Sequence, residues 1–214
     1  MFQLPQRQAV FFLLLPLYSF ALANDLPPEP VQTLIFIRHG EKPANDLGQL
    51  DCRGFNRSLK LPAYFRANFP SPTEIYAPHP SPRRSRQDGV TRYYHYMRPL
   101  ATIEPTAISF GLPVNVEIPY NRPRQLITAL LNDKYRNSVI YISWGHNYLT
   151  EIGRLLLKRF NYDGTFSKWG GDDYERVLIF EITTNKKGER RLEFREARQS
   201  LGKMSEQCML PISV

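Results

Sequence analysis

Short apolar runs alternate along the chain with segments whose apolar residues recur every three or four positions. The first pattern is typical of buried strands, and the second of helices that cover a sheet. Strands are expected at residues 34–37, 74–77, 112–116, 139–144 and 177–182, and a turn at 186–188 leads to an antiparallel edge strand at 191–195. Helices are expected at residues 54–65, 99–110, 123–131 and 149–160. The alternation predicts an α/β fold with three layers and a doubly wound, mostly parallel sheet.

Two stretches have a less regular pattern. In the helix at residues 54–65, the expected buried stripe consists of four apolar side chains, Phe55, Leu59, Leu61 and Ala63. Residues 78–86 contain three prolines and three arginines without an apolar period, which predicts a surface loop beside the end of the second strand. We interpret the arginines of this loop, namely Arg83, Arg84 and Arg86, as a solvated face, and the alternative is that a basic loop beside an anion-binding pocket selects extended anionic ligands.

The N-terminus has the features of a signal peptide. Arg7 precedes an apolar run at residues 9–20, and Ala21-Leu22-Ala23 supplies the small residues that a signal peptidase requires. We therefore expect a signal peptide at residues 1–23, one mature domain at residues 24–214, and a periplasmic or secreted location. A membrane anchor is the alternative, but the run is shorter than the roughly 20 residues that span a bilayer.

The charge of the chain favours an anionic ligand. Lys and Arg number 28 against 20 Asp and Glu, which gives a formal net charge of +8. A positive field attracts anions to the surface. Apart from the three arginines near residue 84, the basic residues are scattered and no basic repeat is interleaved with aromatics, so we expect no nucleic-acid partner.

The two cysteines can be interpreted in two ways. In an oxidising compartment, Cys52 and Cys208 could form a disulfide that ties the C-terminal tail to an early element. Two free, buried thiols are the alternative, because the sequence does not show whether the Cβ atoms lie close enough to pair.

Two histidines directly follow predicted strands. His39, preceded by Arg38, ends the first strand, and His146 comes two residues after Trp144. Ligands of open α/β sheets bind outside the carboxyl ends of the strands, so both imidazoles could face one pocket. A neutral imidazole can attack phosphorus, and nearby guanidinium groups disfavour the imidazolium while they attract an anionic substrate. Arg98, at the start of a predicted helix, would supply a second guanidinium group.

Three motifs in order resemble the histidine phosphatase superfamily, including its phosphoglycerate mutase-like and acid phosphatase-like members. They are Phe36-Ile37-Arg38-His39-Gly40-Glu41, the run from Arg98 to Ala107, and Trp144-Gly145-His146-Asn147, and the resemblance covers most of the mature chain. It implies that His39 accepts the phosphoryl group while Arg38, Arg98 and His146 hold its oxygens. It also implies no metal and no organic cofactor.

The sequence departs from the family at the group that protonates the leaving oxygen. Asn147 follows the second histidine where some members have an aspartate, and an amide cannot donate that proton. Glu117 is our first candidate for the proton donor, with Glu41 and Asp173 behind it. Lys42 stands where phytase-like members have a further arginine, and it could contact a second substrate anion. We count Asn147 among the substrate-binding residues.

The expected function is an exported phosphomonoester hydrolase that acts on a small phosphorylated or other anionic substrate. One alternative is a phosphoanion-binding or regulatory protein of the same fold with weak turnover, which the missing acid suggests. A phosphomutase is a further alternative, although an exported setting with no evident glycolytic partner disfavours it.

Overall fold

A six-stranded sheet forms the centre of the molecule, in the strand order β5-β2-β6-β1-β7-β8. The computed structural model describes residues 29–87, 89–164 and 166–209. The strands of the sheet are β1 (Val31–Arg38), β2 (Glu74–Tyr76), β5 (Val114–Asn115), β6 (Val139–Trp144), β7 (Arg176–Thr184) and β8 (Arg190–Arg198). Strands β5, β2, β6 and β1 run parallel, β7 is antiparallel to β1, and β8 is antiparallel to β7. The mostly parallel sheet with an antiparallel edge is therefore confirmed.

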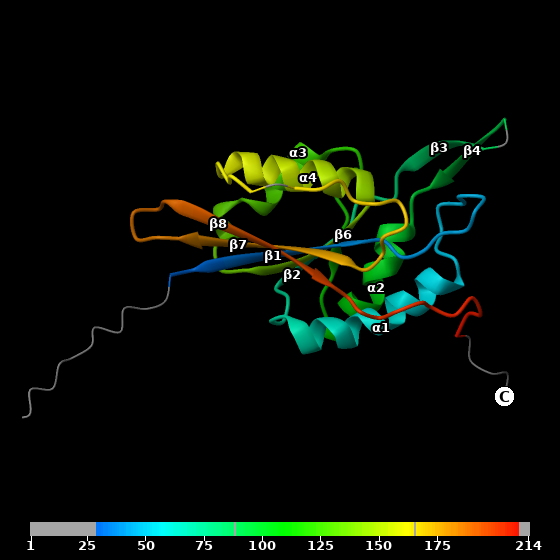
Figure 1. The fold of residues 1–214 in the computed structure, drawn as a ribbon, viewed down its shortest axis with the longest axis horizontal. Helices are drawn as coiled ribbons and strands as arrows, with labels where there is room; N and C mark the ends of the chain where they lie inside the picture. Colours follow the sequence, from blue (N-terminus) through cyan, green and yellow to red (C-terminus); the bar gives the residue numbers. More distant parts are fainter. Residues whose placement is uncertain (1–28, 88, 165, 210–214) are drawn as a thin grey trace, which may run out of the picture.

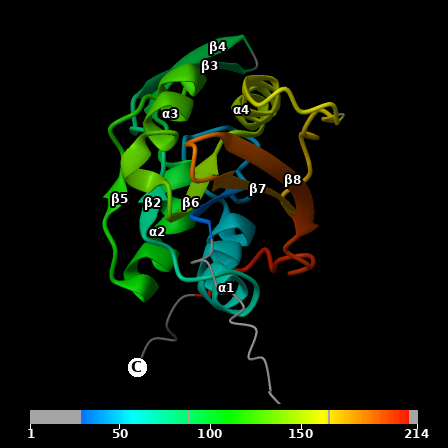
Figure 2. The same ribbon diagram turned by 90° about the vertical axis from the view of Figure 1, so that its left-hand side faces the viewer.

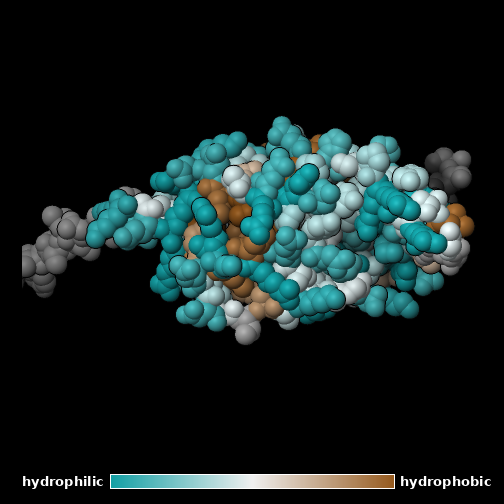
Figure 3. All heavy atoms as spheres, turned by 90° about the horizontal axis from the view of Figure 1, so that it is seen from above, coloured by the Kyte–Doolittle hydropathy of each residue, from teal (hydrophilic) through white to brown (hydrophobic). Residues whose placement is uncertain are grey.

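Helices cover both faces of this sheet, which confirms the three-layer, doubly wound architecture. They are α1 (Cys52–Asn68), α2 (Arg98–Phe110), α3 (Pro123–Leu130) and α4 (His146–Arg159), with a short 3-10 helix at Asp133–Tyr135. Figures 1 and 2 show α1 and α2 on one face and α3 and α4 on the other. The surface on the α3 and α4 side is mostly hydrophilic, with a hydrophobic patch visible among the polar side chains (Figure 3).

Strand β1 contributes to two hydrophobic cores. Leu34 and Phe36 pack in the cluster that includes side chains of α3 and α4. Ile35 and Ile37 point to the opposite face and pack with side chains of α1 and α2. All four side chains are fully buried. Burial on both faces explains why this strand is a continuous apolar run and shows no polar alternation.

The surface loop predicted at residues 78–86 is wrong, because most of this segment belongs to a hairpin. Strand β3 (Pro82–Gln87) pairs antiparallel with β4 (Val90–His95), and the hairpin projects from the end of the molecule at which β1 terminates (Figure 1). The side chains of Ser85 and Tyr94 donate hydrogen bonds to Asp46, at 3.3 and 2.6 Å. Because backbone hydrogen bonds and this polar contact hold the hairpin, its sequence does not need an apolar period.

The buried stripe predicted for α1 is only partly correct. Leu61 is fully buried, whereas Leu59 is 41% exposed and Ala63 is also exposed. The buried face instead includes the polar side chains of Asn56 and Arg57. These two residues have hydrogen-bond partners far away in the sequence, and such partners compensate the cost of burying polar groups. The buried face is therefore rotated away from the apolar stripe.

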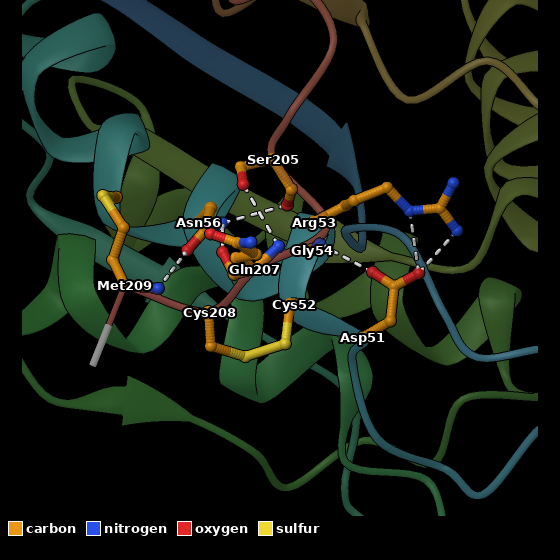
Figure 4. Close-up of a disulfide and its surroundings, with 9 residues drawn as sticks. All are labelled: Asp51, Cys52, Arg53, Gly54, Asn56, Ser205, Gln207, Cys208 and Met209. Carbon is orange, nitrogen blue, oxygen red and sulfur yellow. Dashed lines mark hydrogen bonds and ion pairs between the residues drawn. A yellow bond between two sulfur atoms is a disulfide. The ribbon is translucent and has the colours of Figure 1, made fainter.

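Cys52 and Cys208 form a disulfide between the start of α1 and the C-terminal tail. The amide of Asn56 holds the same tail, because its Nδ2 donates hydrogen bonds to the carbonyl oxygens of Ser205 and Gln207 at 3.0 and 2.8 Å (Figure 4). The predicted pairing of the two cysteines is thus present in the structure, and it connects segments separated by 156 positions.

The predicted signal peptide, residues 1–23, and the predicted domain start at residue 24 lie outside the described residues. Within the part of the chain that the structure describes, no helix combines the length and the apolar character needed to cross a membrane.

Candidate active site

The carboxyl ends of β1 and β6 bring both predicted histidines together. Arg38 pairs in register with Trp144, and the backbone N–H of His39 donates to the carbonyl of Trp144 at 3.0 Å. Helix α4 begins at His146, two residues further along. The strand order therefore places the two histidines at the same edge of the sheet, as the sequence predicts.

A cavity of about 160 Å³ opens at this edge. It brings together the residues predicted for phosphate handling with aromatic side chains from neighbouring segments. Its lining consists of Arg38, His39, Lys42, Asp46, Arg83, Tyr96, Arg98, Tyr120, Gly145, His146, Asn147 and Tyr148. Four of these side chains are cationic and one is a carboxylate, so the cavity suits an anion.

The imidazole of His39 has one nitrogen engaged and one available. Its Nδ1 lies 2.8 Å from the carbonyl oxygen of Gly40 and donates a hydrogen bond to it, which leaves the Nε2 lone pair for chemistry. Burial, the charge of Arg98 and then the charge of Arg38 hold the pKa of His39 well below its ordinary value, although the bond to Gly40 opposes the shift. His39 is therefore a neutral potential nucleophile near pH 7.

The turn that carries His39 is fixed against α1 and α2. A Cβ atom on Gly40 would lie 2.8 Å from the Cα of Gly54 in α1, so this close approach requires glycine at position 40. The N–H of Gly40 donates to the hydroxyl of Thr102 at 2.9 Å, and that hydroxyl donates to the carbonyl of Arg98 at 2.8 Å. Thr102 thereby links the histidine turn to the helix that begins with the second arginine.

Arg38 is held from the side of the segment that precedes β7. Its Nη1 donates to the carbonyl oxygens of Gly171 at 2.5 Å and Asp173 at 3.3 Å, and its guanidinium carbon lies 3.9 Å from the ring centroid of Tyr174. Burial lowers the pKa of Arg38, and the neighbouring tyrosines and aspartates oppose that shift. Its Nε is buried and has no hydrogen-bond partner among the described residues.

Arg98 heads α2 and is 1% exposed. Its Nη1 forms an ion pair with Asp46 at 2.7 Å, and its guanidinium carbon lies 4.8 Å from the ring centroid of Tyr96. Asp46 also accepts a hydrogen bond from Tyr94 and lies 3.7 Å from the ammonium group of Lys42. Arg98 thus lies against a carboxylate, but neither its Nε nor the Nη1 that faces Asp46 makes a hydrogen bond among the described residues.

His146 is the second imidazole of the cavity and begins α4. Burial and the charges of Arg38 and Arg83 lower its pKa to about 4. It is therefore neutral near pH 7 and can donate one hydrogen bond to a bound oxyanion. Asn147 and Lys42 also line the cavity, so both predicted substrate-binding residues lie beside the histidines.

The three carboxylates considered as proton donors do not line this cavity. Glu117 is exposed, beyond the end of β5. Glu41 is buried and accepts hydrogen bonds from the guanidinium group of Arg57. Asp173 accepts backbone and side-chain hydrogen bonds near the start of β7, including those of Arg198.

Sequence reasoning missed Asp46 and the three tyrosines of the cavity lining, Tyr96, Tyr120 and Tyr148, and it did not favour Arg83 as a site residue. Asp46 lies in a loop without a periodic pattern and has a positive φ of 47°. The interpretation of Arg83 as part of a solvated face is wrong, because Arg83 is only partly exposed and lines the cavity. Arg84 and Arg86 are exposed, as predicted. No local signal distinguishes Arg83 from its neighbours, because only the pairing of β3 with β4 sets its direction.

The donor set of the cavity suits an anion better than a metal ion. In residues 29–87, 89–164 and 166–209, no three side chains of His, Cys, Asp or Glu gather as a metal-binding group. The residues that converge on His39 carry guanidinium, imidazole and ammonium groups, which match the oxygens of a phosphate.

Several solved structures are similar to this chain. Mycobacterial hydrolase 2 superposes with a TM-score of 0.52 at 12% identity, over 77% of this chain and 89% of that chain. The protein histidine phosphatase SixA complexed with tungstate has a TM-score of 0.46 at 12% identity, over 78% and 97% of the two chains. The native mycobacterial glucosyl-3-phosphoglycerate phosphatase also has a TM-score of 0.46 at 12% identity, over 77% and 97%.

At these identities, the structural comparison establishes the fold alone. The superposition with mycobacterial hydrolase 2 confirms the α/β architecture predicted from the sequence. No protein-family model matches the chain, and no curated protein matches it in sequence.

Proposed function

We propose that the chain is a phosphomonoester hydrolase of the histidine phosphatase type, with a phosphohistidine intermediate on His39. The observation that carries the proposal is the state of His39, which is neutral, engaged through Nδ1 and lines the same cavity as two buried arginines. In the first step, Nε2 attacks phosphorus and the bond to the leaving oxygen breaks, with its electron pair going to that oxygen. In the second step, water attacks phosphorus, which releases inorganic phosphate and restores the imidazole.

Three surrounding residues are proposed to donate hydrogen bonds to the phosphoryl group. Arg38 and Arg98 both contribute guanidinium groups to the cavity lining, and fixed donors of this kind stabilise charge on the transferring group. His146 donates one further hydrogen bond while it remains neutral. Their burial removes competing water, which strengthens these interactions.

The location and the substrate class form part of the same proposal. Export to the periplasm or the medium is supported by the signal-peptide pattern at residues 1–23 and by the Cys52–Cys208 disulfide. A cavity of about 160 Å³ favours a small phosphorylated substrate. Both points rest on sequence and shape, and a measurement of the compartment in which the protein accumulates would test the first.

The test of the mechanism is turnover of a generic aryl phosphate by the mature protein and by His39→Ala. Loss of the nucleophile should lower kcat by roughly a thousandfold or more. His95→Ala is the matched control, because His95 is exposed and lies outside the cavity lining. Rapid quenching with labelled substrate should trap phosphate on the wild-type protein and not on His39→Ala. Equal rates for the two proteins would remove His39 from the mechanism.

A phosphoanion-binding protein of the same fold is the second candidate. Asp46 is the one carboxylate among the lining residues described, and it forms ion pairs with Arg98 and Lys42. The cavity therefore offers no evident carboxylic acid to protonate the leaving group. This candidate predicts that phosphate or vanadate binds, as measured by calorimetry, without turnover of any phosphomonoester. Binding should weaken in Arg38→Ala and Arg98→Ala under either candidate, so activity is what separates them.

A further inference from the structure

We propose that Arg83 is a specificity-determining residue that receives a second anionic group, on the part of the substrate that leaves. This inference rests on the proposed phosphate site at His39 and deepens it. The favoured substrates are phosphomonoesters whose alcohol portion carries a carboxylate or another phosphate. The argument depends on the direction, the free charge and the depth of Arg83 in the cavity.

The hairpin aims Arg83 at the cavity and its neighbours away from it. Successive side chains of a strand alternate between its two faces. Arg83 lies on the same face as Ser85, whose hydroxyl donates to Asp46 of the cavity. The guanidinium carbon of Arg83 lies 5.1 Å from the ring centroid of Tyr96 and 5.8 Å from that of Tyr120, both of which line the cavity. These aromatic faces hold the guanidinium group in place.

The charge of Arg83 is available to a ligand. Among the described residues, no carboxylate lies within ion-pairing distance of Arg83, and its side chain has no hydrogen-bond acceptor. Arg98 and Lys42, the other two cations on this side, both lie beside Asp46. An oriented guanidinium without a carboxylate is suited to bind an anion through two parallel hydrogen bonds.

The exposure of the lining residues indicates that Arg83 contacts the leaving part of the substrate. Arg38 and Arg98 are each 1% exposed and His39 is 3% exposed, so they form the floor of the cavity. A phosphoryl group must lie against this floor to be attacked. Arg83 is more exposed and belongs to a hairpin that projects beyond the sheet (Figure 1). Since Arg83 also lines the cavity, we assign it to the rim. A substrate seated on His39 would therefore extend its alcohol portion towards Arg83.

The test uses two non-hydrolysable analogues of nearly equal size, benzylphosphonate with a para-carboxylate and benzylphosphonate with a para-carboxamide. Calorimetry gives the Kd of each for the wild-type protein, Arg83→Ala and Arg84→Ala. The wild-type protein should bind the carboxylate about tenfold more tightly, as expected for a charge-assisted interaction with a guanidinium group that water partly screens. Arg83→Ala should bring the ratio close to unity. Arg84→Ala should keep the wild-type ratio, because Arg84 is exposed on the other face of β3.

Three outcomes would overturn the assignment. An unchanged ratio in Arg83→Ala would show that another group receives the second anion. Equal weakening of both analogues in that variant would place Arg83 on the transferring phosphoryl group. Failure of the wild-type protein to bind either analogue would refute the inference and the site together. Binding with the expected ratio and without turnover of any phosphomonoester would support Arg83 and refute the hydrolase alone.

Discussion

His39 owes its neutral state to the side chains that surround it. An imidazole in water titrates near neutral pH, but here burial and two guanidinium groups penalise the imidazolium form. The hydrogen bond from Nδ1 to Gly40 also selects the tautomer whose Nε2 is unprotonated. In the proposed mechanism, the cations that attract the substrate therefore also keep the imidazole of His39 unprotonated.

At the residue scale, the lowered pKa of His146 predicts that the protein loses stability in acid. The unfolded chain binds a proton at this residue below its ordinary value of 6.5, whereas the folded chain binds it only near pH 4. This difference in proton binding therefore has no effect on stability above pH 6.5. It lowers the free energy of unfolding as pH falls from 6.5 towards 4. Urea unfolding should show a smaller free energy of unfolding at pH 4.5 than at pH 7.

The variant His146→Gln isolates this effect, because glutamine does not titrate. The decrease in the free energy of unfolding between pH 7 and pH 4.5 should be smaller in His146→Gln than in the wild-type protein. His95→Gln, an exposed histidine, should behave like the wild type and serves as the control. Identical pH profiles for all three proteins would contradict the assigned pKa.

The pKa values of the acidic groups in the cavity predict that kcat/KM depends steeply on the pKa of the leaving group. Burial alone would raise the pKa of Asp46, but the hydrogen bond from Tyr94 and the charges of Arg98 and Lys42 hold it below the ordinary value. Burial raises the pKa of Tyr96 to about 12. Since neither group is an effective acid near pH 7, kcat/KM should rise strongly across aryl phosphates as the pKa of the leaving phenol falls.

A shallow dependence on the leaving group would contradict this expectation and indicate a proton donor. Glu117→Gln then provides the decisive comparison, because Glu117 is the donor suggested by the sequence. If the dependence is shallow in the wild-type protein and steep in Glu117→Gln, the exposed Glu117 reaches the substrate when it binds. The substitution should otherwise leave the rates unchanged.

At the scale of elements, α1 is anchored by a buried ionic network. The Arg57 guanidinium pairs with Glu41, in the turn after β1, at 2.7 Å and with Glu175, just before β7, at 2.6 Å. Its Nη1 also donates to Gln199 after β8 at 3.0 Å. One side chain of α1 therefore connects the histidine turn to both antiparallel strands.

Replacement of Arg57 should destabilise the protein severely. Arg57→Ala leaves two carboxylates without their partner in a site where the arginine side chain is 3% exposed, and such losses cost about 3–5 kcal/mol. Arg53→Ala is the matched control from the same helix, because its side chain is 38% exposed and its ion pairs should contribute about 0–1 kcal/mol. Chemical denaturation of both variants measures the two values, and similar losses would refute the structural role of Arg57.

At the scale of the whole molecule, the disulfide should stabilise the fold without affecting the chemistry. It closes a loop of 156 positions, and loss of a native disulfide typically costs about 2–5 kcal/mol. Neither cysteine lines the cavity of His39. The double variant Cys52→Ser with Cys208→Ser should therefore unfold at a lower urea concentration and keep the wild-type kcat/KM for an aryl phosphate. Unchanged stability or a large loss of activity would contradict this expectation.

The sequence by itself determined the elements of the core and the position of the two histidines. Apolar periodicity reports which side chains avoid water, and this was sufficient for β1, β6 and α4. The carboxyl end of a buried strand is where an α/β sheet exposes functional groups, so His39 and His146 could be recognised before any coordinates. The paired cysteines were an open choice, and only the fold shows that they meet.

The tertiary structure alone decided the rest of the site and the polar parts of the fold. The direction of Arg83 depends on the pairing of β3 with β4, and Asp46 and the buried face of α1 depend on contacts between polar groups far apart in the chain. Such contacts leave no periodic signal, because a polar residue that will be buried with a partner looks the same in sequence as one that stays in water. The arginines and histidines on the floor of the cavity could thus be predicted from the sequence, as could the lack of an aspartate after His146, whereas the residues at the rim of the cavity could not.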